Sequence, residues 1–161
     1  MIIDALRKRV LTVSLGLVSV AAASALAASP AHADPDGAEA AVWWTFKGSG
    51  YGTCLTAGDT QVAFATACNG GPHQQWDWIH DSNGEPSPQL MNRATGRCLA
   101  TDNASGLNAV WTSTCAWGNG QRFSYDYATG NLNSVYGTKV RAESDGAVRA
   151  GSSFYYWYAS H

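Results

Sequence analysis

The feature that most constrains the fold of this chain is a motif that occurs twice in the same order. Gly-x-Cys-Leu begins at Gly52 and again at Gly96, a second cysteine follows in each copy, and each copy ends in Gln-x-aromatic. The second cysteine precedes the aromatic residue, Trp76 or Phe123, by eight positions in both copies. Self-similarity of this kind predicts a fold built from repeated supersecondary units.

A third copy is visible in outline. The segment from Gly137 to Val140 stands in the place of Gly-x-Cys-Leu, and Tyr155-Tyr156-Trp157 stands in the place of Gln-x-Trp, without cysteines. The intervals between the leading glycines are 44 and 41 residues, which leaves room for about four short strands per copy. Residues 34–161 are rich in Gly, Asn, Ser and Thr, a composition that is typical of short strands joined by turns.

The beginning of the chain has the pattern of a secretory signal. Residues 7–9 are basic, residues 10–28 are mostly apolar, and Ala31-His32-Ala33 matches a cleavage site of small residues. The alternative is a retained membrane anchor, but serines and a glycine interrupt the apolar run, which is short for a bilayer that needs about 20 residues. We expect residues 1–33 to be a signal peptide and residues 34–161 to be one secreted, extracellular domain.

Charge limits the partners that the mature chain can bind. Removing residues 1–33 leaves 7 basic and 11 acidic side chains, a formal net charge of −4. Nucleic acids and anionic membranes attract clustered Lys and Arg, which are absent from this sequence after the leader. We therefore expect neutral or weakly charged partners, and neither nucleic acid nor membrane binding.

All four cysteines lie after the leader, and an oxidising compartment favours two disulfides. Of the three arithmetical pairings, Cys54 with Cys68 and Cys98 with Cys115 each close a loop inside one repeat, and we predict these two. A zinc site is the weaker alternative, because no C-x-x-C occurs and the nearby histidines have no evident third and fourth ligand. We expect no metal and no cofactor.

Gly-x-Cys-Leu, the second cysteine and Gln-x-Trp, in this order, strongly resemble the ricin B-type lectin domain. The resemblance covers essentially all of residues 34–161. It implies an all-β fold, a β-trefoil of three four-stranded repeats with pseudo-threefold symmetry, which we call lobes one to three, and a carbohydrate (glycan or polysaccharide) as the ligand. It also implies that Trp76, Phe123 and Trp157 are buried near the shared axis.

The resemblance places the usual sugar-binding aspartate two residues after the first cysteine and a stacking aromatic two residues before the second. Thr56 and Ala100 occupy the aspartate position in lobes one and two, and Arg141 occupies it in lobe three. Thr66 and Ser113 occupy the aromatic position. The family's polar anchor is therefore absent from all three lobes.

Lobe two offers a substitute. Antiparallel partners share a constant residue-number sum, so if Cys98 and Cys115 are opposed, Asp102 and Trp111 are opposed as well. An aromatic ring suits the apolar face of a pyranose and a carboxylate suits its hydroxyls. We predict a carbohydrate site there, with Asn119 and Gln121 as its further members. We predict a poorer site in lobe one, formed by Asp59, Phe64, His73 and Gln74. In the alternative, Trp111 packs over the disulfide and Asp102 is a turn residue.

Lobe three is expected to be a tight hairpin without a sugar site, with Asp145-Gly146 as a two-residue turn and Lys139 opposed to Ser152. The chain contains no G-x-S-x-G or H-E-x-x-H motif and no paired carboxylates at a fixed spacing, so we expect no enzyme activity. We expect the protein to be a monomer. The remaining rival function is that of a trefoil whose protruding loops bind a protein, as protease inhibitors do.

Overall fold

A computed structural model describes residues 42–82 and 87–161. The predicted signal peptide, residues 1–33, and its cleavage point before Asp34 lie outside the described residues. The described part of the chain contains twelve β-strands and two short 3-10 turns, and no α-helix. The strands are β1 (Thr45–Gly48), β2 (Thr53–Ala57), β3 (Ala63–Ala67), β4 (Trp76–Ile79), β5 (Gln89–Asn92), β6 (Cys98–Thr101), β7 (Leu107–Ser113), β8 (Phe123–Asp126), β9 (Asn131–Ser134), β10 (Lys139–Ala142), β11 (Val148–Gly151) and β12 (Trp157–Ser160).

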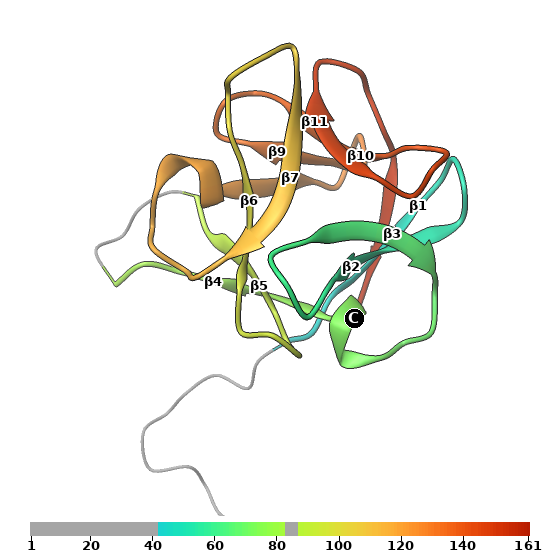
Figure 1. Cartoon of the computed structure of the whole chain (residues 1–161), viewed down its shortest axis with the longest axis horizontal. Coiled ribbons are helices and arrows are strands. Elements are labelled where there is room, and N and C mark those ends of the chain that lie inside the picture. The colour runs from blue at the N-terminus through green and yellow to red at the C-terminus, as the bar shows by residue number, and fades with distance from the viewer. Residues whose placement is uncertain (1–41, 83–86) are drawn as a thin grey trace, which may run out of the picture. The chain divides into compact units, whose positions relative to one another are not determined.

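The twelve strands form three consecutive units of four, β1–β4, β5–β8 and β9–β12. In each unit the second and third strands make an antiparallel hairpin, and the fourth strand pairs with the first strand of the next unit. Strand β12 pairs with β1 along four residues and so closes the ring. Figure 1 shows the three hairpins gathered on one side of this ring. This is the architecture of a β-trefoil, as the sequence predicts.

Each hairpin contacts the other two. Strand β7 pairs with β11 through Leu107, Asn108 and Ala109. Single bridges join Val62 to Trp111 and Phe64 to Ala147, so the lobe-one hairpin contacts both neighbours. The outer edges of the hairpins are thereby partly paired with one another, which limits exposed strand edges.

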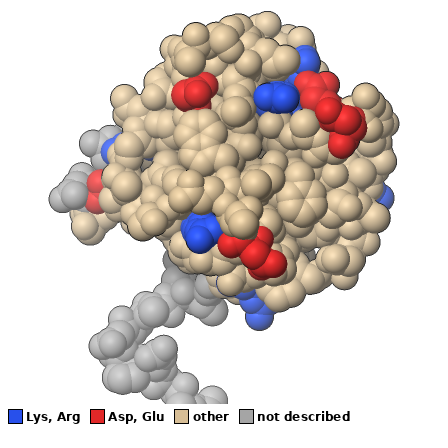
Figure 2. Space-filling model, in the orientation of Figure 1, with Lys and Arg blue, Asp and Glu red and all other residues tan. Residues whose placement is uncertain are grey.

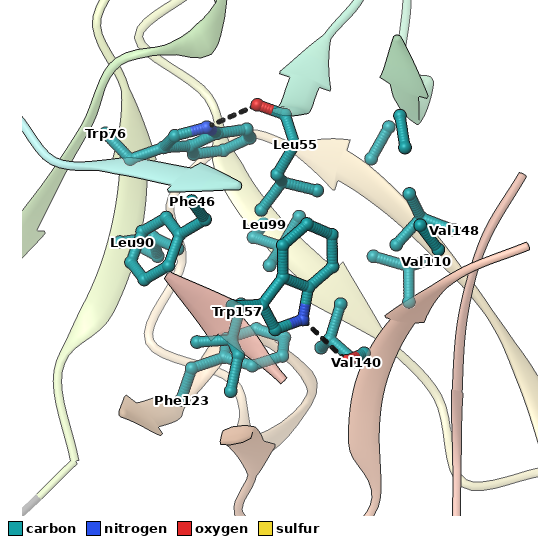
Figure 3. Packing of buried hydrophobic residues seen from close by; sticks show 14 of the residues in the cluster. Phe46, Leu55, Trp76, Leu90, Leu99, Val110, Phe123, Val140, Val148 and Trp157 are labelled. Carbon is teal, nitrogen blue, oxygen red and sulfur yellow. Dashed lines mark hydrogen bonds between the residues drawn. The ribbon is translucent and has the colours of Figure 1, made fainter. Parts of the chain in front are cut away.

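The core is built from the same strand positions in each lobe. Trp76, Phe123 and Trp157 are fully buried, which confirms their predicted place. Around them pack Phe46 and Leu90 from the first strands and Leu55, Leu99 and Val140 from the second strands (Figure 3). Leu132 of β9 belongs to the same cluster. Both tryptophans also donate a hydrogen bond from the indole nitrogen, Trp76 to the carbonyl of Leu55 (3.0 Å) and Trp157 to that of Val140 (2.8 Å). The indole thus joins the fourth strand to the second strand of its lobe.

The lobe-three hairpin differs from the sequence prediction by one residue. Lys139 is opposed to Gly151 and not to Ser152, and Glu143 donates a backbone hydrogen bond to Ala147 across a three-residue loop. The predicted two-residue Asp145-Gly146 turn is therefore wrong. Gly146 has a φ of +83°, and the loop ends in the left-handed residue that a three-residue hairpin requires.

Truncation of a central aromatic tests this core. Trp76→Ala should lower the free energy of unfolding by about 3–5 kcal/mol, because it opens a cavity and leaves the Leu55 carbonyl without its donor. Urea denaturation followed by circular dichroism measures the change. Phe154→Ala is the control, since Phe154 is 76% exposed, and it should cost less than about 1 kcal/mol. Equal losses in the two variants would contradict a central role for Trp76.

Candidate functional site

The two predicted disulfides are present. The sulfur atoms of Cys54 and Cys68 are 2.04 Å apart and those of Cys98 and Cys115 are 2.02 Å apart, with Cα–Cα distances of 5.0 Å in both bridges. No described cysteine is free. Each bridge links the second strand of its lobe to the segment that follows the third strand.

The register of these hairpins differs from the predicted one by two residues. Cys54 lies opposite Thr66 and Cys98 lies opposite Ser113, so neither cysteine faces its disulfide partner in the ladder. The physical reason is that Cys68 and Cys115 lie beyond the ends of β3 and β7, where pairing has stopped and the bridge runs diagonally. The prediction that Asp102 and Trp111 are directly opposed is therefore wrong.

The corrected register places an aromatic residue at a position that the sequence reasoning missed. Trp111 is opposed to Ala100, and Phe64 is opposed to Thr56, so in both lobes an aromatic faces the position at which the sequence resemblance implies an aspartate. The sequences of β3 and β7 contain a signal that could have indicated this position. Phe64 and Trp111 are the only aromatic residues of β3 and β7, and both alternate with buried small or β-branched residues.

Strand alternation decides which way the lobe-two side chains point. Leu99, Thr101, Val110 and Thr112 are buried and face the core. Trp111 lies on the opposite, outer face and is half-buried. Asp102 follows the last residue of β6 and, with the register extended by one pair, faces Ala109, so it is a diagonal neighbour of Trp111 on the same outer face. Diagonal neighbours lie about 7–8 Å apart, within reach of a large ring.

The equivalent pair in lobe one supports this placement. Gly58 occupies the position of Asp102, and a Cβ atom built on Gly58 would lie 3.5 Å from the ring of Phe64. The aromatic of this hairpin thus reaches over the residue that follows the second strand. The carboxylate of Asp102 makes one long hydrogen bond, 3.5 Å from the Ala104 backbone nitrogen, and is half-buried.

The tip of the lobe-one hairpin forms one wall beside Trp111. Val62 is bridged to Trp111, and the backbone nitrogen of Thr112 donates to the carbonyl of Gln61 at 3.2 Å. The Arg97 guanidinium also donates to the carbonyl of Asp59 at 3.0 Å. The outer face around Trp111 is therefore built by two lobes, although the sequence reasoning assigned it to lobe two alone.

The 3-10 turn η2 (Asn119–Gln121) packs against the end of β6 and brings Asn119 toward Asp102. A Cβ atom on Gly120 would lie 2.4 Å from the carbonyl oxygen of Thr101, so only glycine allows this approach. Asn119 itself is exposed, with its side chain at the surface. Asp102, Asn119 and Trp111 thus belong to one region of the surface.

The two glutamines of the Gln-x-aromatic motif have a different role. Gln74 is fully buried, accepts a hydrogen bond from Asn69 and donates to the carbonyl of Ala67. Gln121 is 7% exposed, accepts from Ala116 and donates to the carbonyl of Thr114. Both amides are occupied by the segment that leaves the hairpin. We therefore withdraw Gln74 and Gln121 as sugar-binding candidates, because their polar atoms hold the backbone and do not reach the surface.

The remaining lobe-one candidates lie together. The Nδ1–H of His73 donates to the carbonyl of Ala57 at 2.9 Å, and its Nε2 lies 3.5 Å from the carboxylate of Asp59. Phe64 packs over the adjacent Gly58. Lobe one thus presents an aromatic ring, an imidazole and a carboxylate, with a phenyl ring in place of the indole of lobe two.

Lobe three carries charge at the same hairpin position. Arg141 and Arg149 are directly opposed, where the other lobes have Thr56 with Phe64 and Ala100 with Trp111. The Arg141 guanidinium forms an ion pair with Glu143 at 2.7 Å. Neither residue of this opposed pair is aromatic, so lobe three has no stacking ring at the position of Phe64 and Trp111.

The face of the molecule shown in Figure 2 is mostly uncharged, with a few acidic and basic groups that in part lie side by side, and with no broad patch of one sign. Within residues 42–82 and 87–161, no group of three or more His, Cys, Asp or Glu side chains is placed to hold a metal ion. The described residues include no helix of the length and apolar character needed to span a membrane.

Neither a scan against protein-family models nor a search of curated proteins found a match to this chain. Solved structures do match. The crystal structure of the designed three-fold symmetric protein ThreeFoil is similar over 74% of this chain and 98% of its own, with a TM-score of 0.61 and 21% sequence identity. At this level of identity the similarity concerns the fold alone, and it agrees with the trefoil topology.

The structural role of the motif glutamines can be tested on Gln121. Gln121→Ala should lower the free energy of unfolding by about 1–3 kcal/mol, because the Ala116 backbone N–H and the Thr114 carbonyl lose their partner. Asn119→Ala, at an exposed position two residues away, should change it by less than about 0.5 kcal/mol. Denaturant unfolding checks both values, and unchanged stability of Gln121→Ala would contradict this role.

Proposed function

We propose that the protein is a secreted, non-catalytic carbohydrate-binding module that binds neutral sugars or polysaccharide on the outer face of the β6–β7 hairpin. The observation that carries this proposal is the half-buried indole of Trp111 on that face, with the Asp102 carboxylate diagonal to it. We take the β-trefoil fold as the scaffold and these side chains as the site, since a fold alone does not define a function.

Each group has a separate role in the proposed site. The Trp111 ring stacks on the apolar face of a pyranose, an interaction with little directional preference. The carboxylate of Asp102 accepts hydrogen bonds from sugar hydroxyls and sets the orientation of the ring. The amide of Asn119 supplies a donor and an acceptor beside it. Such a site is shallow and wet, and its affinity for a single sugar is weak.

Secretion and the absence of catalysis are parts of the same proposal. The two disulfides suit an oxidising compartment, in agreement with the leader-like residues 1–33. The described cysteines are all bridged and supply no thiol nucleophile. Strands β6 and β7 contain no Asp or Glu. Asp102 therefore has no second carboxylate within these strands that could form an acid–base pair with it beside Trp111.

The direct test uses Trp111→Ala in affinity electrophoresis or pull-down with a panel of neutral polysaccharides. The variant should lose most binding and stay folded, because the disulfide and core face are unchanged. Phe64→Ala should lose less, since lobe one has the smaller ring, and Phe154→Ala, an exposed aromatic away from both hairpin positions, should bind like the parent protein. Unchanged binding by Trp111→Ala would contradict the proposed site.

The role of Asp102 predicts a change in preference more than in total affinity. Asp102→Asn keeps an acceptor and adds a donor, so the ranking of sugars in the same panel should change while some binding remains. Because the ligand is neutral, raising salt from about 0.05 to 0.5 M should leave binding nearly constant. A steep loss of binding with salt would indicate an anionic ligand instead.

A protein-binding trefoil is the second candidate, and one observation favours it. The hairpin tips expose apolar side chains, with Val62 50% and Leu107 46% exposed. Exposed apolar groups on protruding loops suit contact with a protein surface. If no polysaccharide binds the parent protein, while Val62→Asp or Leu107→Asp reduces capture of one defined protein partner, this second function replaces the first.

A further inference from the structure

The trefoil has three seams where the first and fourth strands of one lobe meet, and equivalent residues occupy each seam. The residue just before the first strand is Trp44, Pro88 or Gly130 in lobes one, two and three. Trp44 exchanges backbone hydrogen bonds with Trp76, Pro88 accepts from Phe123, and Gly130 accepts from Trp157. The backbone is therefore the same at all three seams, whereas the side chains differ.

In lobe one the seam is filled by a stacked ring. The indole of Trp44 lies on the imidazole of His161, with ring centroids 4.4 Å apart and an angle of 4° between the planes. His161 is the residue that faces Trp44 when the β1–β12 register is extended by one pair. The edge of Tyr127 closes the stack, at a centroid distance of 6.2 Å.

In lobe three a different ring covers the seam. A Cβ atom on Gly130 would lie 2.5 Å from the ring of Tyr156, so the tyrosine lies directly over the glycine. Two of the three equivalent positions are thus covered by aromatic rings that belong to the chain itself.

Lobe two has a proline at this position and a pocket beside it. The pocket has a volume of about 230 Å³ and is lined by Trp78, His80, Pro88, Ser124, Tyr125 and Tyr127. By strand register, His80 is the equivalent of His161, and Pro88 takes the place of the indole that stacks on it in lobe one. The pocket is open to solvent on one side, and its volume exceeds that of an enclosed apolar cavity of about 150 Å³ that holds benzene, so a larger ring fits in it with one edge in solvent.

The lining is mainly aromatic, and lobe one shows an aromatic ring stacked at the equivalent position. The hydroxyl of Tyr125 donates to the carbonyl of Trp157 at 2.5 Å, and burial raises the pKa of this hydroxyl, which therefore stays neutral and occupied. The other lining side chains with polar groups are Ser124, His80, Trp78 and Tyr127, and each contributes a single hydroxyl, imidazole or indole N–H. In lobe one the equivalent imidazole, that of His161, stacks on an indole, so the His80 imidazole offers a flat aromatic ligand the same kind of face.

We propose that the lobe-two seam is a binding pocket for a small neutral aromatic ring of the indole or phenol class. The ligand lies on His80 as Trp44 lies on His161, with Tyr127 and Trp78 as neighbouring walls. This pocket is separate from the hairpin face around Trp111, and it does not depend on the proposed sugar site.

Titration with indole, followed by two-dimensional ¹H–¹⁵N NMR of the folded protein, tests the pocket. Indole should bind saturably at one site and shift the signals of residues around Trp78, His80 and Tyr127. Pro88→Trp places in lobe two the side chain that fills the seam in lobe one, and it should abolish indole binding. The Pro88 carbonyl, which accepts from Phe123, is retained in this variant. Trp111→Ala is the matched control and should bind indole like the parent protein.

A second variant covers the case in which Pro88→Trp fails to fold. His80→Ala changes an exposed side chain and should weaken indole binding by about three- to tenfold through loss of the stacking partner. No saturation by about 5 mM indole overturns the proposal, as does full binding by folded Pro88→Trp or by His80→Ala. Shifts at the pocket signals with galactose in place of indole also overturn it, since the pocket would then be a sugar site.

Discussion

The structure depends on the packing of three equivalent aromatic residues, Trp76, Phe123 and Trp157, at the centre of the barrel. Each lies at the start of a fourth strand, and the two tryptophans also bond a carbonyl of the second strand. The preceding motif glutamine, two residues before, holds the segment that leaves the third strand in lobes one and two. The Gln-x-aromatic motif thus links the fourth strand of a lobe to its hairpin and to the segment that follows the third strand. Lobe three lacks both the glutamine and the disulfide, and it retains the aromatic residue alone.

The diagonal disulfides explain why Trp111 and Asp102 lie on the predicted face of the hairpin but opposite other residues than predicted. The predicted and observed registers differ by two residues, and a shift of two keeps every side chain on its own face. Trp111 and Asp102 therefore remain on the outer face of the hairpin, as expected, while Trp111 faces Ala100. In lobe three the error was a single residue and arose from the turn, where a three-residue loop replaces the expected two-residue one.

Equivalent positions in a repeated fold share their backbone and differ in what their side chains can do. The outer hairpin position carries phenyl, indole and guanidinium groups in lobes one, two and three. The seam position carries Trp44, Pro88 and Gly130, and a pocket is present where the side chain is proline. Each proposed binding role therefore comes from a departure from threefold symmetry. Comparison of equivalent positions in the three lobes indicates what kind of group fits each position.

The sequence by itself determined the repeat, the twelve short strands, the disulfide pairing and the three central aromatics. The repeat, the number of strands and the disulfide pairing follow from local spacing, because a motif at a fixed interval predicts equivalent places in equivalent units. The burial of the three aromatics follows from the family resemblance of that motif. Only the tertiary structure decided the register beside the disulfides, the burial of Gln74 and Gln121, and the meeting of Val62 with Trp111. These depend on where pairing stops and on contacts between lobes more than 40 residues apart in sequence. The lobe-two pocket also belongs to this second group, because its walls come from β4 and β8, which spacing along the chain does not place side by side.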